Sequence, residues 1–212
     1  MVLNMIKKAF KFYALPMYIL IHPFDGFYNM KFQNEGTVKL AVLNFLLVCL
    51  SLAFRTQYAS IIVNLPNPVF MNSFIDLLMV AGALLLFCVG NWSVTTLTDG
   101  EGRFKDIFMA VCYAMTPLVL TIIPATLLSN VLAAEEVGFY YMLLGVGMFY
   151  FVFLTLIGLV TIHNYGAIKT LVTIMLTFIA ILIIVFLLTL LFTLWQQLVT
   201  FVYSVYTELM FR

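Results

Sequence analysis

The chain contains five long apolar stretches, and none of them holds an Asp, Glu, Lys or Arg. They cover residues 40–54, 77–98, 107–134, 137–162 and 170–207. A helix needs roughly 20 apolar residues to cross the hydrocarbon core of a bilayer, and the five stretches reach or approach that length. Only 9% of the 212 residues are charged, whereas soluble domains are about a quarter charged. The sequence therefore predicts an all-α fold, a polytopic transmembrane helical bundle with five spans.

The absence of charge within the stretches also limits function. A proton relay or an ion pathway needs ionisable side chains at membrane depth, so the spans themselves argue against both. Cys49, Cys88 and Cys112 all lie in apolar stretches, are odd in number and show no motif spacing. We therefore expect buried, inert thiols rather than a disulfide framework or a metal site.

The basic residues are distributed unevenly between the two sides of such a bundle. Eight of the ten Lys and Arg residues fall before the first span, between the second and third spans, or between the fourth and fifth. The other side receives only Arg55 and Arg212. The positive-inside rule then predicts a cytoplasmic N-terminus and an extracytoplasmic C-terminus. Arg55, near the outer end of a first span at about 38–58, is expected to anchor in the headgroups or to pair with Asp76.

Residues 1–36 are predicted to form a cytoplasmic, interfacial segment ahead of the membrane domain at 37–212. Residues 1–21 show a helical apolar stripe with Lys7, Lys8 and Lys11 on another face. Such a basic amphipathic helix lies on an anionic leaflet. Residues 12–24 are apolar, but they are short and contain Pro16 and Pro23. We therefore expect an interfacial or shallowly inserted segment rather than a sixth span. The predicted membrane-surface residues are Lys7, Lys8, Lys11, His22 and Asp25, with Asp25-Gly26 forming a turn.

The third stretch contains Pro117 and Pro124, each of which removes a helical hydrogen bond and predicts a kink. The kinked span is either a bent packing helix or the wall of a hinge or cavity. Polar side chains at membrane depth are expected to join helices by hydrogen bonds; these are Asn44, Asn91 and Asn130. Two pairs of glycines on single helix faces are expected to allow close helix contacts: Gly82 with Gly90, and Gly138 with Gly145.

The fifth stretch is longer than one crossing requires. Trp195, Gln196 and Gln197 mark its expected outer interface, and apolar residues continue beyond them at helical spacing. We expect a C-terminal amphipathic extension that either bends along the outer leaflet or projects outward.

The densest polar cluster is the loop at 91–106, between the second and third stretches. Asp99-Gly100 and Glu101-Gly102 predict a tight turn with positive φ, and Asp106 is a plausible helix cap. The loop is the candidate contact surface for a partner, and its candidate residues are Asn91, Thr96, Asp99, Gly100, Gly102, Phe104, Lys105 and Asp106.

This loop, N-W-x3-T-L-x-D-G-x-G-x-F-K-D, is followed by Ala114, Pro117 and Leu118. Together with the opening His22-Pro23-Phe24-Asp25-Gly26-Phe27, it resembles the bacterial branch of the Yip1 domain family over roughly residues 20–210. The resemblance implies five spans in a bacterial plasma membrane. The long polar N-terminal region of eukaryotic members and their aspartate-leucine-tyrosine-glycine-proline motif are missing, so contact with Rab GTPases is not carried over. Some bacterial relatives are encoded beside sugar ABC transporter genes, which implies an accessory membrane subunit.

No motif indicates an enzyme, a cofactor, nucleic-acid binding or a small-molecule substrate. The sequence has no nucleophile elbow, phosphate loop or cluster of metal ligands, and His22 and His163 are interpreted as membrane-surface residues. The leading hypothesis is a non-catalytic membrane scaffold or accessory subunit. Its partners would be the lipid bilayer and another integral membrane protein, with ABC transporter subunits as one candidate. The alternatives are a transport or lipid-handling protein for neutral or lipid-like cargo, and a membrane-shaping protein.

Overall fold

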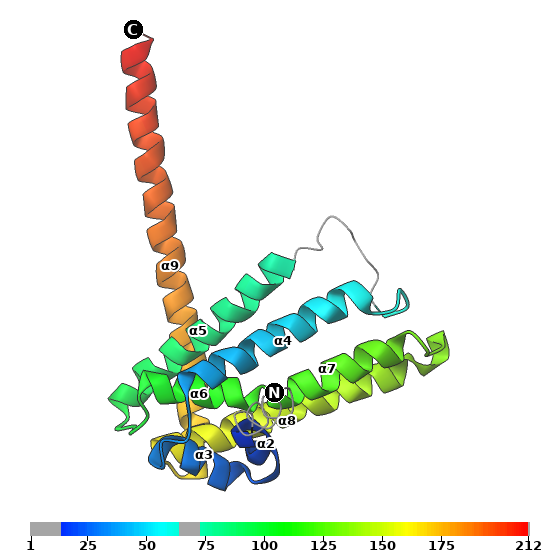
Figure 1. Ribbon diagram of the computed structural model, residues 1–212. Helices are drawn as coiled ribbons and strands as arrows, with labels where there is room; N and C mark the ends of the chain where they lie inside the picture. Colours follow the sequence, from blue (N-terminus) through cyan, green and yellow to red (C-terminus); the bar gives the residue numbers. More distant parts are fainter. Residues whose placement is uncertain (1–13, 64–72, 212) are drawn as a thin grey trace, which may run out of the picture.

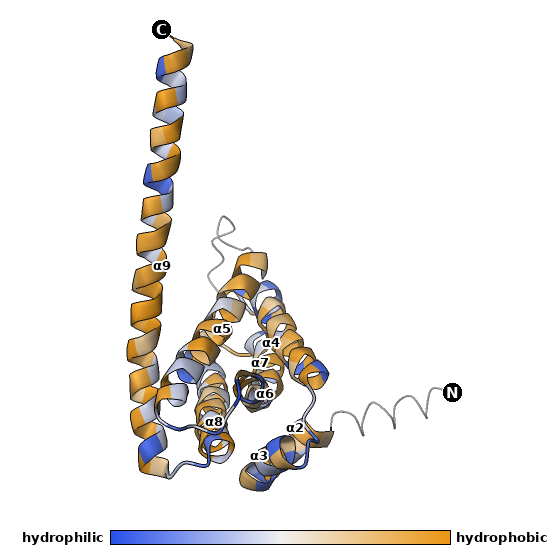
Figure 2. Ribbon diagram, turned by 90° about the vertical axis from the view of Figure 1, so that its left-hand side faces the viewer, coloured by the Kyte–Doolittle hydropathy of each residue, from blue (hydrophilic) through white to orange (hydrophobic). Residues whose placement is uncertain are grey.

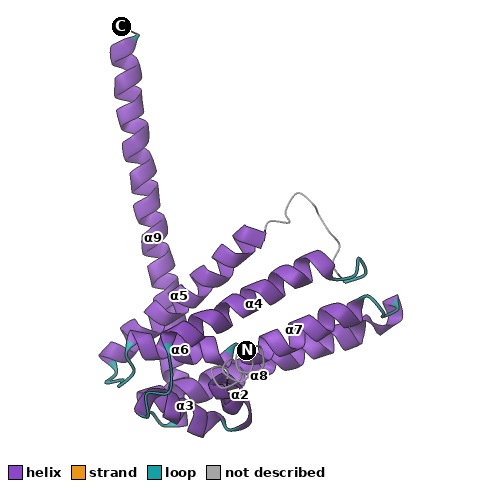
Figure 3. Ribbon diagram, in the orientation of Figure 1, coloured by secondary structure: helices purple, strands orange, loops and turns teal. Residues whose placement is uncertain are grey.

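The computed structural model describes residues 14–63 and 73–211, and all regular structure in that part of the chain is helical (Figure 3). Lys7, Lys8, Lys11 and most of the expected amphipathic helix at 1–21 lie outside the described residues. The helices are α2 (Ala14–Ile21), α3 (Pro23–Phe32), α4 (Val38–Tyr58), α5 (Ser73–Leu97), α6 (Phe104–Ala114), α7 (Thr116–Ser129), α8 (Val137–His163) and α9 (Ala167–Met210), with a 3-10 turn, η1, at Ala134–Glu136.

Five helical segments are long and apolar enough to cross a membrane, which confirms the predicted number of spans. They are α4, α5, α6 continued by α7, η1 continued by α8, and α9. We call the end of the bundle where α5 and α8 finish and α6 and α9 begin the loop end, and the opposite end the far end (Figure 1). The outward faces of these helices are largely apolar, as contact with lipid requires (Figure 2).

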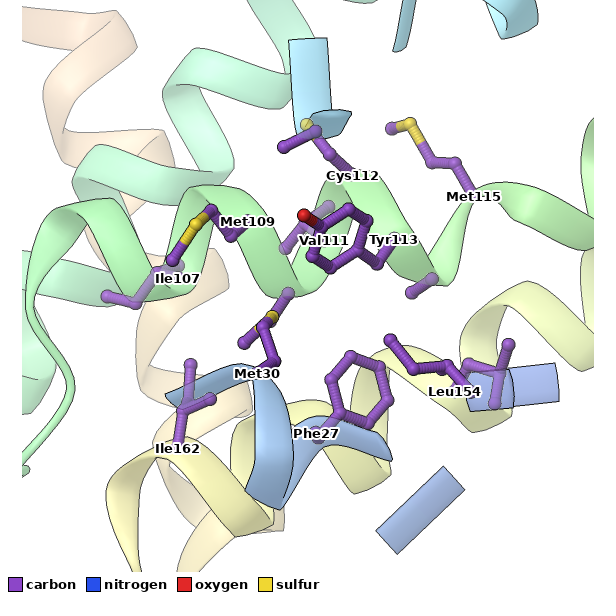
Figure 4. Close-up of a cluster of buried hydrophobic side chains, with 14 of the residues drawn as sticks. Phe27, Met30, Ile107, Met109, Val111, Cys112, Tyr113, Met115, Leu154 and Ile162 are labelled. Atoms are coloured by element: carbon purple, nitrogen blue, oxygen red, sulfur yellow. The ribbon is translucent and has the colours of Figure 1, made fainter. Parts of the chain in front are cut away.

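The hydrophobic core surrounds α6. In the most apolar 18 residues of the third span 61% are buried, whereas the corresponding parts of α4 and α9 are 33% and 11% buried. Phe27 and Met30 of α3 pack on α6 from one side, together with Leu154 and Ile162 of α8 (Figure 4). The core therefore includes the segment before the first span, which the sequence had placed at the membrane surface.

Tyr113 ties the start of α4 to this core. Its hydroxyl donates to the carbonyl oxygen of Thr37 at 2.9 Å and accepts from the Thr37 backbone N–H at 3.0 Å. The Thr37 hydroxyl accepts from the backbone N–H of Leu40 and so caps the helix. The first span begins after Thr37 as predicted.

The third span is interrupted at Met115, two residues before Pro117. Pro117 has no N–H for the carbonyl of Tyr113, and the hydroxyl of Thr116 donates to that carbonyl instead, at 2.6 Å. The side-chain amide of Asn44 donates to the carbonyl of Cys112 and to the Thr116 hydroxyl. The helix is thus interrupted two residues before Pro117, one of the two prolines at which a kink was predicted.

Pro124 lies within α7, where the helix continues through it.

The predicted interhelical role of asparagine is confirmed at both ends of the bundle. Asn44 joins α4 to the break, and the Asn130 amide donates to the carbonyl of Tyr58 at 3.0 Å.

The predicted glycine contacts are correct only in part. A Cβ atom on Gly90 would lie 2.8 Å from a side-chain carbon of α9, so this glycine allows α5 and α9 to approach closely. Gly82, Gly138 and Gly145 have nothing within 4 Å of such an atom, and their predicted role is wrong. Gly147, for which no close contact was predicted, lies against Thr121 of α7 instead.

Arg55 does not pair with Asp76, and that alternative is wrong. Its Nε donates to the Tyr140 hydroxyl at 2.8 Å, which links α4 to α8 near the far end. Asp76 is exposed, and within residues 14–63 and 73–211 the one ion pair joins Lys31 to Glu101.

Helix α9 is unbroken over 44 residues, a length of about 66 Å at 1.5 Å per residue. Thr170, Thr173 and Thr177 are buried, and Gly90 of α5 lies against Thr177. From Val185 to Thr200 every residue is exposed, and the helix diverges from the other spans (Figures 1 and 2). The helix continues through Trp195–Gln197, so the bend that the sequence allowed is absent.

The break at Met115 generates the first prediction. Replacing Asn44 by Leu keeps the volume of the side chain but removes the donor for the Cys112 carbonyl. An unsatisfied buried acceptor costs about 1–3 kcal/mol. We expect Asn44→Leu to lower the thermal midpoint of the detergent-solubilised protein by several degrees. Asn130→Leu, which removes an exposed amide, should lower it much less, and equal losses in the two variants would contradict the role of Asn44.

Candidate functional site: the loop between α5 and α6

The loop of residues 98–103 lies against the end of α8, and its two glycines pack on His163. A Cβ atom on Gly100 would lie 2.7 Å from Nδ1 of His163, and one on Gly102 would lie 2.5 Å from its Cε1. The positive φ angle of the turn belongs to Asp99, at 57°. No glycine in the described part has a positive φ. The predicted turn with a positive φ is therefore present, but at Asp99 and not at the glycines, which are required for close approach to the imidazole.

His163 is the central side chain beneath the loop. It is only 2% exposed, so its interpretation as a membrane-surface residue is wrong. Nδ1 accepts from the backbone N–H of Gly102 at 3.3 Å, and Nε2 lies 3.2 Å from Oδ1 of Asn91. A ring nitrogen that accepts a hydrogen bond carries no proton, so in this arrangement the imidazole is neutral and Nε2–H donates to Asn91.

Asn91 extends the connection from α8 to α9. Its side-chain amide donates to the Thr177 hydroxyl at 3.1 Å, while its oxygen accepts from His163. The Thr177 hydroxyl donates in turn to the carbonyl of Thr173. One chain of hydrogen bonds therefore joins the loop, α8, α5 and α9. A buried polar network whose members are all partnered rigidifies the elements that it joins.

Tyr165 supports the loop from the turn that follows α8. Its ring stacks on His163 with centroids 5.4 Å apart. Its hydroxyl donates to the carbonyl of Thr98 at 2.8 Å, and Nζ of Lys169 lies 4.1 Å from the ring centroid. Asn164, with a φ of 54°, ends α8 in the left-handed conformation and so turns the chain toward this position.

Lys31 of α3 completes the network. Its Nζ donates to the carbonyl of Ile162 at 2.6 Å and lies 3.7 Å from Oε2 of Glu101. The ammonium group stands at the C-terminus of α8, where the helix dipole favours a positive charge. Lys31 is one of the eight basic residues that predict the topology, and no spacing in the sequence indicates α8 as its partner. We call Lys31, Asn91, Thr98, His163 and Tyr165 the loop network.

The outer surface of the loop is exposed and mixed in character. Among the predicted contact residues, Asn91 and Gly102 are buried and Gly100 is half-buried, so these three support the surface. Asp106, in the first turn of α6, accepts from the backbone N–H of Arg103, the N-cap residue, at 3.1 Å. The remaining predicted residues are exposed, as are two charged neighbours and two apolar ones: Thr96, Asp99, Phe104, Lys105, Glu101, Arg103, Trp92 and Leu97.

The predicted membrane-surface residues of the N-terminal segment lie apart from this loop. His22 lies between α2 and α3, and Asp25 occupies the first turn of α3; both are exposed. Asp25-Gly26 is helical, so the predicted turn at this position is wrong. The three cysteines are free and buried, as expected. Within the described residues, no three His, Cys, Asp or Glu side chains come together as metal ligands.

Five apolar spans joined at one end by a buried polar network define a multi-pass helical membrane protein. The chain belongs to the Yip1 domain family, because the model of the Yip1 domain matches residues 17–190. The match begins within α2, includes the whole loop and ends within α9. Comparisons with curated proteins and with solved structures gave no match.

The contact between the loop and His163 generates the second prediction. Gly102→Ala would place a methyl group 2.5 Å from the imidazole, and overpacking of this kind costs typically about 1–3 kcal/mol. We expect a lower thermal midpoint and faster tryptic cleavage after Arg103 and Lys105. The control is Gly166→Ala, where nothing lies within 4 Å of the added carbon, and it should behave as the wild type. Unchanged cleavage in Gly102→Ala would show that the glycine is not needed to hold the loop.

Proposed function

We propose that the protein is a non-catalytic scaffold or accessory subunit of a membrane complex, and that the exposed side chains of residues 91–106, in and beside the 98–103 loop, form its contact surface. One observation carries the proposal: the loop backbone is held from below by buried groups, while its charged side chains remain exposed. A rigid surface loses less conformational entropy on binding than a mobile loop does.

The composition of this surface also suits a protein partner. Trp92 and Phe104 contact each other edge to face with centroids 6.4 Å apart, and Leu97 is 85% exposed. Aromatic residues are enriched in interfaces and carry much of their binding energy. The charges of Asp99, Arg103 and Lys105 around them would provide specificity.

The distribution of basic residues supports an orientation for this surface. If the positive-inside rule holds, the loop and the N-terminus face the cytoplasm and the C-terminus lies outside, in a bacterial plasma membrane. A membrane protein with a cytoplasmic contact surface suits a complex with a cytoplasmic or integral membrane subunit. The resemblance makes a subunit of a sugar ABC transporter the first partner to test.

The third prediction tests the contact surface. The tagged protein is purified from its native membrane in a mild detergent, and its partners are quantified by mass spectrometry. We expect a stoichiometric membrane partner whose yield falls at least about tenfold in the Arg103→Glu, Lys105→Glu double variant, equivalent to a loss of about 1.4 kcal/mol. The control reverses two charges at the far end, Glu135→Lys with Glu136→Lys, and should retain the partner. A monodisperse lone protomer, or equal loss in both variants, would refute the proposal.

A second candidate is transport or handling of neutral or lipid-like cargo, and two observations favour it. The third span is interrupted at Met115, and interrupted helices line the substrate sites of many transporters. A cavity of about 490 Å³ lies between α2, α3 and α4, which is within the usual size range of ligand sites.

The fourth prediction concerns this second candidate. Liposomes containing the protein should then move a neutral solute or a fluorescent lipid analogue faster than empty liposomes. Pro117→Ala, at the interruption, should reduce the rate at least about fivefold, about 1 kcal/mol. Pro124→Ala, the same substitution within a continuous helix, should leave the rate almost unchanged. A rate equal to that of empty liposomes would exclude this function for the solutes tested.

A further inference from the structure

Helices α2 and α3 form a hairpin that runs alongside α8 instead of lying across its end. Three contacts give the alignment. Lys31 reaches the carbonyl of Ile162 in the last turn of α8, and Phe27 lies against Gly158 one turn earlier. The Tyr150 hydroxyl donates to the carbonyl of Leu20 at the end of α2. Positions earlier in the hairpin therefore contact positions progressively farther from the loop end.

The last of these contacts gives the depth of the hairpin. Tyr150 precedes the end of α8 by 13 residues, or about 20 Å of helix. The 27 residues of α8 cover about 40 Å, some 10 Å more than the hydrocarbon core. Leu20 is therefore near the middle of the bilayer. Helical side chains also incline toward the helix N-terminus, which here moves the tyrosine hydroxyl still farther from the loop end.

One exposed face of the hairpin is apolar, as contact with acyl chains at this depth requires. Ile21 is 76% exposed and Phe24 is 60% exposed, although both lie close to the tip of the hairpin. Tyr28 and Phe32 continue the same face along α3 at one-turn spacing. On α8, Phe149 and Phe153 are also exposed.

Several backbone groups at the tip are satisfied within the protein. The N–H of His22 donates to the carbonyl of Tyr18 at 2.8 Å, and the N–H of Gly26 donates to the carbonyl of His22 at 2.9 Å. Pro23, which begins α3, has no N–H that would need a partner. The carbonyl of Leu20 accepts from Tyr150. In hydrocarbon each unsatisfied backbone group costs several kcal/mol, so these bonds lower the free-energy cost of burying the tip.

Gly26 allows the two arms to lie close together. A Cβ atom on Gly26 would come within 2.9 Å of the Cα of Ile19, a backbone atom of the opposite arm that has little room to move. The function proposed above does not use the segment of residues 22–27. In this segment His22 and Pro23 form the tip, Phe24 is the exposed aromatic residue, Gly26 makes the close contact and Phe27 lies in the core.

We propose that α2 and α3 form a re-entrant hairpin, which enters the membrane from the side of the 98–103 loop and returns to that side. Its tip lies near mid-depth, and its outer face, Met17, Ile21, Phe24, Tyr28 and Phe32, is covered by lipid acyl chains. The hairpin adds no span, so the number of crossings remains five.

The hairpin also carries two ionisable side chains, His22 and Asp25, to a depth where the spans themselves have none. Asp25 lies one helical turn from Asn29, which lines the cavity between α2, α3 and α4 together with Glu35 and Thr37. Polar groups and non-spanning backbone are tolerated within a membrane where they line a cavity that holds water. The lining of this cavity is mixed, with Leu15 and Leu40 beside the polar groups. Ionisable residues at such a depth are commonly functional.

The fifth prediction measures the depth of two residues on one face of α3. Phe24→Trp and Phe32→Trp are made separately in a Trp92→Phe, Trp195→Phe background and reconstituted with lipids brominated at defined acyl positions. If α3 runs alongside α8, the two tryptophans differ in depth by about 12 Å, because eight residues separate them. Phe24→Trp should be quenched best by bromines near the chain ends, and Phe32→Trp by bromines near the headgroup. Phe149→Trp, in the middle of α8, provides the deep reference.

Equal, shallow depths for the two tryptophans would overturn the proposal, because a hairpin lying flat on the leaflet gives that result. A second measurement does not depend on the tryptophan variants. In intact proteoliposomes, a membrane-impermeant maleimide should label Gln33→Cys but not Ile21→Cys. Equal labelling of both cysteines would likewise refute a re-entrant hairpin.

Discussion

In this fold, the constraint on which most of the structure depends is that a backbone carbonyl inside a membrane needs a donor from the protein. The helices are interrupted at three places close to the core: after α2, at Met115 and at the end of α8. Each interruption frees carbonyl groups, and each receives a donor from a side chain of another helix. The three donors are Tyr150, Asn44 and Lys31. The points where the helices break are therefore also the points where they are joined.

These joints are concentrated in the half of the bundle near the loop end. There most residues of α6 from Ile107 to Ala114 are buried, and the loop network connects α3, α5, α8 and α9. At the far end the connections are fewer, and they link α4 mainly to α7 and α8 through groups such as Arg55 and Asn130. Helix α9 contacts α5 near the loop end and then diverges (Figure 1). The molecule is thus rigid where its polar loop is exposed and open to lipid elsewhere.

The features that follow from local pattern could be predicted from the sequence. Apolar run length gave five spans, Thr37 gave the start of the first span, and Pro117 gave the interruption of the third, because each depends on chemistry within a few residues. The position of His163 could not be predicted. A histidine at the end of an apolar run looks the same whether it faces headgroups or a loop from another part of the chain. Lys31 was ambiguous for the same reason, since its partners lie 70 and 131 residues away.

The role of the loop glycines also depends on a distant part of the chain and could not be predicted from local sequence. Gly100 and Gly102 were recognised as necessary, but for a positive φ, which a sequence motif can suggest. The actual reason is the proximity of an imidazole, which no local motif encodes. The hydrogen bonds of His163 also bear on function. Each buried side-chain nitrogen and oxygen in the described part has a hydrogen-bond partner, and His163 uses both ring nitrogens to hold the loop and Asn91. A histidine engaged in this way positions a surface, and this favours a contact role for the loop over a chemical one.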